Sequence, residues 1–365
     1  MKILVVEDRA ANILLYKRAA AALNKRGYGL KISDFNNLKD ALRALKEKDF
    51  DGAIIDLKLS AGTDEAEGNQ IIKEIVDIKR FPVFVYSSFP EEIDAAIPES
   101  AFFKKFRRTD ITLLALLTEL KRIYDTGITK ILGKDGFIED YLTKIFWENI
   151  AGSFDFFKDN EVPRDQLLRY IAGHIYEHLE LGGDGSFTDY YPEEVYIIPS
   201  IKKSHFTGSI LEDKTTKKYY IILTPPCDIA QGKTASVIIA KIDSFEEYPV
   251  GSWLGIFKKK MPSGGAGRIL KKKKKEILAK LERLIRNNYA QMYYFLPQSE
   301  RFKGGLINFR ELQTIKVSDL NRLYNLKAAI NSQFLKDIIA RFSFYYSRQG
   351  APDLNLSLDD FMSRL

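Results

Sequence analysis

Short apolar runs alternate with amphipathic segments over the first 125 residues of the chain. The runs at residues 3–6, 30–35, 53–56, 83–87 and 101–103 have the length and the β-branched or aromatic content of buried strands. Between them, apolar residues recur every three or four positions, which is typical of helices packed on a sheet. Five strand–helix units in succession predict an α/β fold, in which a parallel sheet is covered by helices on both faces.

Side chains able to bind a metal or a phosphate follow four of these predicted strands. Glu7 and Asp8 follow the first run, Asp56 ends the third, Ser87 ends the fourth and Lys105 follows the fifth. The carboxyl ends of parallel strands lie at one edge of a sheet, where ligands bind in folds of this class. Three carboxylates, one hydroxyl and one amine at that edge could hold a divalent cation beside an acid that accepts a phosphoryl group.

On these positions, residues 1–125 resemble the receiver domain of two-component response regulators, a flavodoxin-like (βα)5 fold. The resemblance covers about a third of the chain, and Gly68 stands where that family usually has a glycine. It implies that a histidine kinase phosphorylates Asp56, with Mg²⁺ as the cofactor. A kinase-like ATPase is a further expected partner. It also implies that Glu7, Asp8, Asp56 and the backbone carbonyl of Lys58 hold the ion.

The same resemblance assigns Ser87 and Lys105 to contacts with the phosphoryl oxygens, and Phe102 to the position of an aromatic switch residue. Lys104 could serve in place of Lys105. Phosphorylated Asp56 would pull on these groups and shift a surface of the domain between two states.

Three features depart from the family pattern. Phe106 follows the lysine where the family usually has a proline, and Ser60-Ala61 replaces a proline that commonly follows the acceptor. The loop between Asp56 and Gly68 is also longer than usual. The alternative prediction is therefore a pseudo-receiver, which keeps the fold and serves protein contacts without being phosphorylated.

The pattern changes after residue 125. Residues 126–188 predict a helical connector, with helices expected at 137–150 and 163–181. Residues 189–365 predict an α+β effector domain with a β-rich core that could be barrel-like. Strands are expected at residues 195–199, 219–223, 236–242 and 293–296, and a helical tail follows them at residues 317–344.

Composition narrows the class of protein. The chain has 365 residues, of which 45% are hydrophobic and 29% charged, as in a globular protein of two or three domains. Cys227 is the single cysteine, which excludes an intrachain disulfide framework and fits a reducing cytoplasm. No secretory signal follows Met1, and no apolar run approaches the roughly 20 residues of a membrane span. A cytoplasmic protein without a membrane partner is expected.

Positive charge is concentrated in one segment. The chain carries a net charge of +7, whereas residues 258–286 alone hold 12 Lys or Arg and 2 Asp or Glu. The segment could bind a polyanion such as nucleic acid, or it could be a solvated loop. No helix-turn-helix is evident. The lysines of this predicted patch are Lys258, Lys259, Lys260, Lys271, Lys272, Lys273, Lys274 and Lys275.

Two groups of residues could give the effector domain an enzymatic function, as a nuclease or hydrolase controlled by phosphorylation. Cys227 and Asp228 follow a predicted strand, and His205 could pair with the cysteine. Their segment resembles uncharacterised bacterial proteins with a Thr-Pro-x-Cys-Asp sequence, which implies no particular activity. His174 and His178 are spaced to bind a metal from one helix face. The alternatives are an inert cysteine in a turn and ordinary packing histidines.

The chain as a whole predicts an atypical response regulator that signals rather than catalyses. Phosphorylation of the receiver would switch an effector that binds a protein or nucleic-acid partner. The last predicted helix of residues 1–125 carries Leu113, Leu116, Leu117 and Leu120. These leucines could couple the domains or form the face of a homodimer, and simple packing on the sheet is the alternative.

Overall fold

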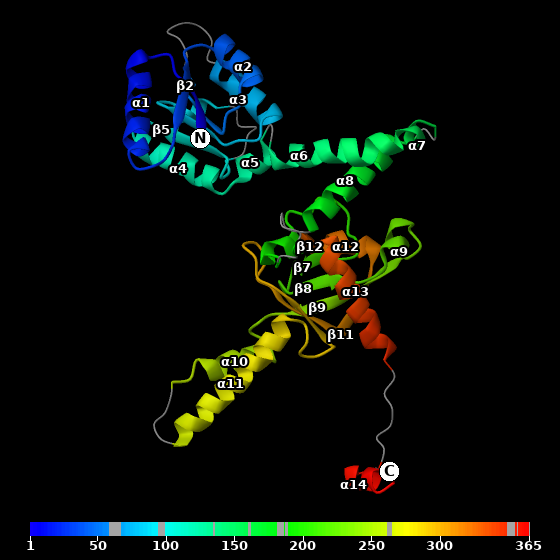
Figure 1. Cartoon of the computed structure of the whole chain (residues 1–365). Helices are drawn as coiled ribbons and strands as arrows, with labels where there is room; N and C mark the ends of the chain where they lie inside the picture. The colour runs from blue at the N-terminus through cyan, green and yellow to red at the C-terminus, as the bar shows by residue number, and fades with distance from the viewer. Residues whose placement is uncertain are drawn as a thin grey trace. The chain divides into compact units, whose positions relative to one another are not determined.

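The computed structural model describes residues 1–57, 67–93, 99–133, 136–159, 162–180, 186, 189–260, 265–348, 355 and 357–364. The chain divides into two compact units, unit 1 (Met1–Phe187) and unit 2 (Thr188–Leu365). Figure 1 labels the helices and strands of both units.

Unit 1 is built on a parallel sheet of five strands in the order β2-β1-β3-β4-β5. All neighbouring strands run parallel, so their carboxyl ends share one edge of the sheet (Figure 1). This is the flavodoxin-like order, and it confirms the fold predicted for the N-terminal part. The strands are β1 (Lys2–Val6), β2 (Lys31–Phe35), β3 (Gly52–Ile55), β4 (Val83–Ser87) and β5 (Phe103–Arg107).

Alternation along the strands gives this sheet two apolar faces. Leu4 and Val6 lie in a core with α2 and α3, whereas Ile3 and Val5 lie in a core with α1 and α4. The side chain of Asn37 accepts a hydrogen bond from the backbone N–H of Asp40, the third residue of α2, and caps that helix. The helical elements of this part are α1 (Ala10–Asn24), α2 (Leu38–Glu47), α3 (Glu67–Ile78), η1 (Pro90–Glu92) and α4 (Leu113–Asp125).

Strand β5 differs from the prediction. The sequence predicted a strand that ends before Lys105, but β5 begins at Phe103 and continues to Arg107. The strand lies at the edge of the sheet, where charged side chains are tolerated, and its two lysines obscured the alternation. Phe103 packs into one core and Phe106 against the other. Lys105 therefore lies inside the strand, and the carboxyl end belongs to the two arginines that follow Phe106.

The rest of unit 1 is helical in both stretches where the sequence predicts helices. The first stretch begins as an α-helix and continues as a π-helix, η2. The second is a single α-helix of 17 residues. The elements are α5 (Ile128–Leu132), α6 (Phe137–Lys144), η2 (Ile145–Ile150), η3 (Ala151–Ser153), α7 (Phe154–Asp159) and α8 (Arg164–Glu180).

Unit 2 is built on a seven-stranded antiparallel sheet in the order β10-β11-β9-β8-β7-β12-β6. The sheet curls into half of a barrel, and among the described residues no pairing closes it between β10 and β6. The predicted barrel-like core is thus present only in this open form. The strands are β6 (Tyr196–Ile197), β7 (Ser209–Asp213), β8 (Tyr219–Ile222), β9 (Ser236–Asp243), β10 (Tyr293–Leu296), β11 (Gly305–Lys316) and β12 (Tyr324–Ile330).

Helices pack on both faces and at one end of this sheet. Ile338 of α13 lies in the larger core, and Leu320 of α12 lies in the core on the other face. Helices α10 and α11 pack together against β10. No helix of the described residues is long and apolar enough to cross a membrane. The helical elements are η4 (Pro192–Val195), α9 (Pro226–Ala230), α10 (Val250–Phe257), α11 (Gly265–Ile285), α12 (Val317–Leu323), α13 (Ser332–Ser347) and α14 (Leu358–Met362).

The prediction of a helical tail at residues 317–344 is wrong for the middle of that segment, which is a strand. Helix α12 ends at Leu323, β12 follows directly, and α13 begins only at Ser332. Strand β12 pairs with β7 and β6, and its Ala328 and Ile330 enter the core beneath α13. The segment has residues that also suit a helix, so its pairing with strands distant in sequence overrides its local propensity.

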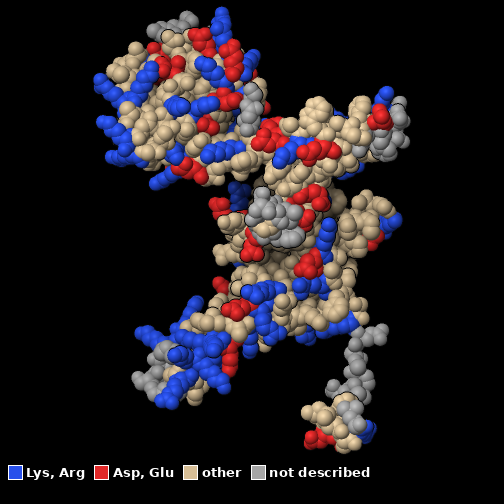
Figure 2. Space-filling view, viewed as in Figure 1, with Lys and Arg blue, Asp and Glu red and all other residues tan. Residues whose placement is uncertain are grey.

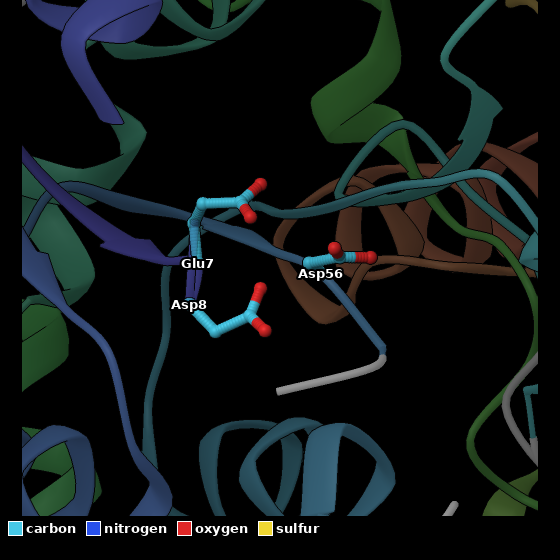
Figure 3. Close-up of side chains that lie close together, drawn as sticks. All are labelled: Glu7, Asp8 and Asp56. Atoms are coloured by element: carbon cyan, nitrogen blue, oxygen red, sulfur yellow. The ribbon is translucent and has the colours of Figure 1, made fainter. Parts of the chain in front are cut away.

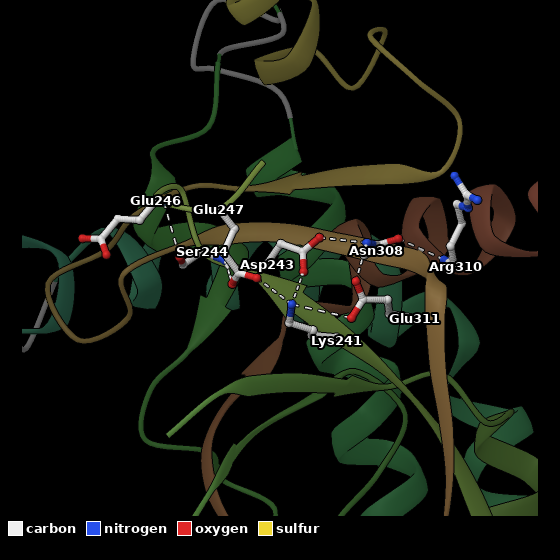
Figure 4. A network of polar contacts seen from close by, with 8 residues as sticks. All are labelled: Lys241, Asp243, Ser244, Glu246, Glu247, Asn308, Arg310 and Glu311. Atoms are coloured by element: carbon white, nitrogen blue, oxygen red, sulfur yellow. Dashed lines mark hydrogen bonds and ion pairs between the residues drawn. The ribbon is translucent and has the colours of Figure 1, made fainter. Parts of the chain in front are cut away.

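A buried polar network joins β9 to β11 in unit 2 (Figure 4). Lys241 lies 2.8 Å from Asp243 Oδ1 and 2.6 Å from Glu247 Oε2. Asn308, beside an irregularity in β11, donates to Asp243 Oδ2 at 2.8 Å and to Glu311 at 3.4 Å. Burial alone would lower the pKa of Lys241, but Asp243 and Glu247 outweigh burial and raise it. Lys241 is therefore a fixed cation that anchors the two strands, not a free amine.

Helix α4 does not present the predicted dimer face. Leu116, Leu117 and Leu120 are fully buried in the core formed with Ile3 and Val5, and Leu113 is partly buried against the same core. These leucines pack on the sheet and are not available to a second copy of the chain.

Replacing Leu116 with Ala is expected to lower the free energy of unfolding by about 2–5 kcal/mol, because the change leaves a cavity in a closed core. The control is Leu114→Ala on the same helix. Leu114 is 43% exposed, so its loss should change stability by roughly 0.5 kcal/mol. Urea unfolding followed by circular dichroism measures both variants, and equal losses would contradict this packing.

Candidate functional site

The acid cluster, defined as Glu7, Asp8 and Asp56, is positioned by the pairing of β1 with β3. Val6 is in register with Ile55, and the Asp56 N–H donates a hydrogen bond to the Val6 carbonyl at 2.9 Å. The three acids therefore leave neighbouring strands side by side (Figure 3). Each offers a carboxylate oxygen within 4.8 Å of the oxygens of the other two.

Burial concentrates the negative charge of this cluster. Glu7 is fully buried and Asp56 is 8% exposed. The backbone N–H groups of Arg9 and Leu57 donate to Glu7 Oε1 at 3.0 Å and to Asp56 Oδ1 at 2.9 Å. Asp8 Oδ1 is buried without a hydrogen-bond partner among the described residues, and burial together with Glu7 raises the pKa of Asp8. Oxygen donors grouped this closely fit a hard divalent cation such as Mg²⁺.

Arg108 is the residue of this site that the sequence reasoning missed. Its Nη2 atom lies 2.5 Å from Glu7 Oε2 and 2.6 Å from Asp56 Oδ2. The guanidinium also lies over the Tyr86 ring, 5.6 Å from its centroid. Burial alone would lower the pKa of Arg108, but Asp56 and Glu7 outweigh it and raise that pKa. Arg108 thus balances part of the charge of the acid cluster.

The place of Arg108 follows from the pairing of β4 with β5. Ser87 is in register with Arg107, and the Arg108 N–H donates to the Ser87 carbonyl at 3.1 Å. The Tyr86 hydroxyl donates to the carbonyl oxygens of Arg108 and Ile111 at 3.3 and 3.2 Å, and so holds the segment that follows β5. Phe103 and Phe106 pack on opposite faces of the sheet, so the fifth strand could have been predicted to continue as far as Phe106. Arg108 would then have been expected at the edge of the sheet that carries the acids.

Neither lysine predicted to contact the phosphoryl group lies at that edge. Lys104 is inside β5 and forms an ion pair with Glu119 of α4 at 2.7 Å. Lys105 is inside the same strand. Among the described residues, the cation in contact with Asp56 is Arg108. The role of Lys105 therefore stays a prediction, and the observed geometry favours Arg108 in its place.

Three other predicted positions have different outcomes. Ser87 ends β4 at the edge of the acid cluster, and it is 2% exposed. Phe102 directly precedes β5, so it lies at the opposite, amino-terminal end of the strands, where it is 45% exposed. The geometry does not support its predicted role as a switch residue. Lys58 lies outside the described residues.

The structure does not join Cys227 to His205. Cys227 is exposed on α9, with its Sγ atom 3.7 Å from Asp228 Oδ1. His205 is half-buried, burial lowers its pKa, and its Nε2 atom has no hydrogen-bond partner among the described residues. In the described part of the chain, no hydrogen bond or ion pair links His205 with Cys227 or with Asp228. A cysteine–histidine pair is therefore not formed.

His174 and His178 each have an aromatic partner of their own. His174 Nδ1 lies 2.9 Å from the Tyr170 carbonyl oxygen, and the two rings are 4.3 Å apart. His178 stacks on Tyr141 at 5.5 Å. Within the part of the chain that the structure describes, the acid cluster is the one group of three or more side chains suited to hold a metal. The predicted metal site at these histidines has no third ligand there.

Solved structures similar to this chain include receiver domains. A CheY-like response regulator receiver domain from Methylobacillus flagellatus is 22% identical over 34% of this chain and 98% of its own, with a TM-score of 0.26. The N-terminal domain of a response regulator/sensory box/GGDEF three-domain protein from Carboxydothermus hydrogenoformans is 23% identical over 35% and 99%, with a TM-score of 0.26. A response regulator from Thermotoga maritima in complex with Mg(2+)-BeF is 18% identical over 33% and 97%, with a TM-score of 0.25. No family model and no curated protein matches the chain.

The exposed thiol of Cys227 should behave independently of His205. At each pH from 6 to 9, the His205→Ala variant is expected to react with iodoacetamide at Cys227 at the same rate as the wild type. The reason is that no hydrogen bond connects the two side chains. Intact-mass spectrometry follows the reaction at the single cysteine. A slower alkylation of the variant at neutral pH would show that His205 activates the thiol. It would support the alternative that this part of the chain is an enzyme.

Replacing Arg108 with Met is expected to lower the free energy of unfolding by about 3 kcal/mol, because Glu7 and Asp56 lose their cation. Added MgCl2 should recover part of that loss. Arg107→Met is the matched control, because Arg107 forms an exposed pair with Glu91 that contributes about 0–1 kcal/mol. Urea unfolding with EDTA and with Mg²⁺ measures both. Equal stability of the two variants in EDTA would show that Arg108 does not balance the acids.

Proposed function

We propose that unit 1 is a receiver domain in which Asp56 accepts a phosphoryl group from a histidine kinase, and that this event regulates unit 2. The observation that supports the proposal most directly is the convergence of Glu7, Asp8 and Asp56 at the carboxyl edge of a flavodoxin-like sheet. The buried, unpartnered Oδ1 atom of Asp8 fits a cation ligand. The three acids would hold Mg²⁺, which when bound supplies positive charge beside the transferred group.

The acceptor oxygen is Asp56 Oδ2, because Oδ1 is held by the Leu57 N–H. In the transfer, this oxygen attacks the phosphorus of a phosphohistidine and an acyl phosphate forms. The P–N bond breaks, and the kinase histidine leaves as an imidazole that keeps the electron pair of that bond. Oδ2 is also the atom that Arg108 contacts, so the guanidinium must release it before the attack. Arg108 can then bind the phosphoryl oxygens, which offer more negative charge than the carboxylate they replace.

Arg108 also provides a route by which the modification could change the fold. Its backbone is bonded to Ser87 at the end of β4 and to the Tyr86 hydroxyl, which also holds Ile111 just before α4. A shift of the guanidinium toward a phosphoryl group would strain these contacts. The segment between β5 and α4 is therefore our candidate for the two-state element that a partner reads.

One observation favours the pseudo-receiver alternative. The ion pairs of Arg108 with Glu7 and Asp56 already balance two of the three acids that would hold Mg²⁺. In a pseudo-receiver this guanidinium would replace the metal permanently, and the fold would act through its surface alone.

Phosphorylation distinguishes the two. Incubation with acetyl phosphate and Mg²⁺ is expected to add one phosphoryl group to the wild-type chain, as measured by intact-mass spectrometry, and beryllofluoride with Mg²⁺ should shift amide NMR signals of Ser87 and Arg108. Asp56→Asn should abolish both effects. Asp51→Asn is the control, since Asp51 lies at the amino end of β3 and accepts a bond from the Lys2 N–H.

The proposal fails if folded wild-type protein takes up no phosphoryl group and shows no NMR change with beryllofluoride. If Arg108→Met gains phosphorylation that the wild type lacks, Arg108 has replaced the metal and the pseudo-receiver alternative holds.

A further inference from the structure

Helices α10 and α11 form a two-helix arm on unit 2 (Figure 1). Trp253 of α10 packs with Ile277 and Leu284 of α11, and the three side chains are buried. Near the far end of the arm, Lys274 Nζ donates to the Lys259 carbonyl at 3.0 Å and lies over the Phe257 ring. The face of α11 that carries Ile277 and Leu284 is thus already covered. The rest of the helix is exposed and mostly charged, although Ile269, Leu278 and Ile285 also remain exposed on it.

The outer part of this arm carries positive charge without compensation. Residues 258–275 contain nine Lys or Arg and no Asp or Glu. None of these nine forms an ion pair with an acid of the described chain, whereas cations elsewhere do, such as Lys241 with Asp243 and Arg341 with Asp337. Figure 2 shows the resulting concentration of basic side chains over the arm. We call this surface the basic tip, and its members are Lys258, Lys259, Lys260, Arg268, Lys271, Lys272, Lys273, Lys274 and Lys275.

The arrangement of the lysines in the basic tip favours one kind of anionic partner, a groove lined by phosphates, over a flat membrane surface. Residues 271–275 are consecutive on a helix, so at about 100° per residue their side chains point around its whole circumference. A flat membrane meets only one side of a helix, and it favours helices with a free apolar face. The face of α11 with Ile277 and Leu284 is occupied by α10. A groove lined by phosphates on both sides would instead meet the lysines that point away from α10 on more than one side of the helix.

The major groove of B-form DNA has this shape. It is roughly 12 Å wide, and an α-helix with its side chains is about 10–12 Å across. The major groove of an A-form RNA duplex is too narrow and deep for a helix. Lysines make phosphate contacts that carry no sequence information, and the tip has no asparagine, glutamine or acid to read bases.

We propose that the basic tip binds double-stranded DNA without sequence preference, by inserting the lysine-bearing turns of α11 between the phosphate backbones of the major groove. The partner also relieves an internal conflict, because Lys271 and Lys275 are like charges four residues apart on α11 and repel each other. This inference concerns unit 2 alone and does not rest on phosphorylation of Asp56.

The test compares DNA binding of the full-length chain with that of a variant in which Lys271–Lys275 are all replaced by Gln. Glutamine has a helix propensity close to that of lysine, so α11 should remain folded, as circular dichroism will show. Fluorescence anisotropy with a mixed-sequence duplex is measured over a series of salt concentrations. The wild-type affinity should fall steeply with salt, and the variant's slope of log K against log salt should be shallower by roughly 3–5.

A matched variant controls for net charge. Five exposed cations of unit 1 are replaced by Gln, and this change should leave the slope unaltered; they are Lys25, Arg26, Lys39, Lys46 and Lys48. Ile269→Gln, which removes the apolar side chain of the tip that is 71% exposed, should also leave DNA binding unchanged.

Three results would overturn the proposal. The first is an equal salt slope for wild type and the Lys271–Lys275 variant. The second is binding to vesicles of anionic phospholipid, lost in Ile269→Gln, with no binding to duplex DNA. The third is binding to single-stranded or RNA competitors as tight as to duplex DNA, because this would exclude recognition through the major groove.

Discussion

The buried charge of the acid cluster is the constraint on which unit 1 depends. Parallel pairing of β1 with β3 places three carboxylates within 4.8 Å of one another, and in a buried site such charges repel strongly. A cation is needed, and the segment after β5 supplies Arg108. The pairing of β4 with β5 and the hydroxyl of Tyr86 matter because they hold the residue that carries this guanidinium in place.

The formal charge of the site is not fully balanced by Arg108. Three carboxylates and one guanidinium sum to −2, because −3 + 1 = −2.

A divalent cation would bring this sum to zero, which a monovalent ion would not. A phosphoryl group on Asp56 would then replace one negative charge by about two, and so disturb the balance again. Arg108 is the cation within reach of that group, and its backbone directly follows β5 and is hydrogen-bonded to Ser87 at the end of β4. The same residue that balances the unmodified site is therefore the one whose position would change if Asp56 were phosphorylated.

The sequence predicted those features that depend on local pattern. Strands β1, β3 and β4 are continuous apolar runs that are buried on both faces of the sheet, so their carboxyl ends, and with them Glu7, Asp8, Asp56 and Ser87, could be located. Arg108 was missed because β5 is an edge strand with charged positions. In unit 2, β7, β11 and β12 were missed because their stability comes from antiparallel partners far away in the chain. The spacing of His205 and Cys227 likewise could not tell whether the fold brings them together.

The acid cluster with Arg108 and the basic tip differ in how strongly salt screens their charges. This difference limits how phosphorylation at the acid cluster could control the basic tip. Arg108 is paired with buried acids, where salt screens little, whereas the lysines of the basic tip are exposed and unpaired. Phosphorylation changes the charge at Asp56 by about one unit, and beyond roughly 8 Å in physiological salt such a change is screened. At any larger separation it could not act on exposed lysines through its field alone. Any control of DNA binding by Asp56 would need a direct contact or a structural element with two discrete arrangements. The segment that joins Arg108 to α4 is suited to that role, because the same hydroxyl of Tyr86 holds both of its ends.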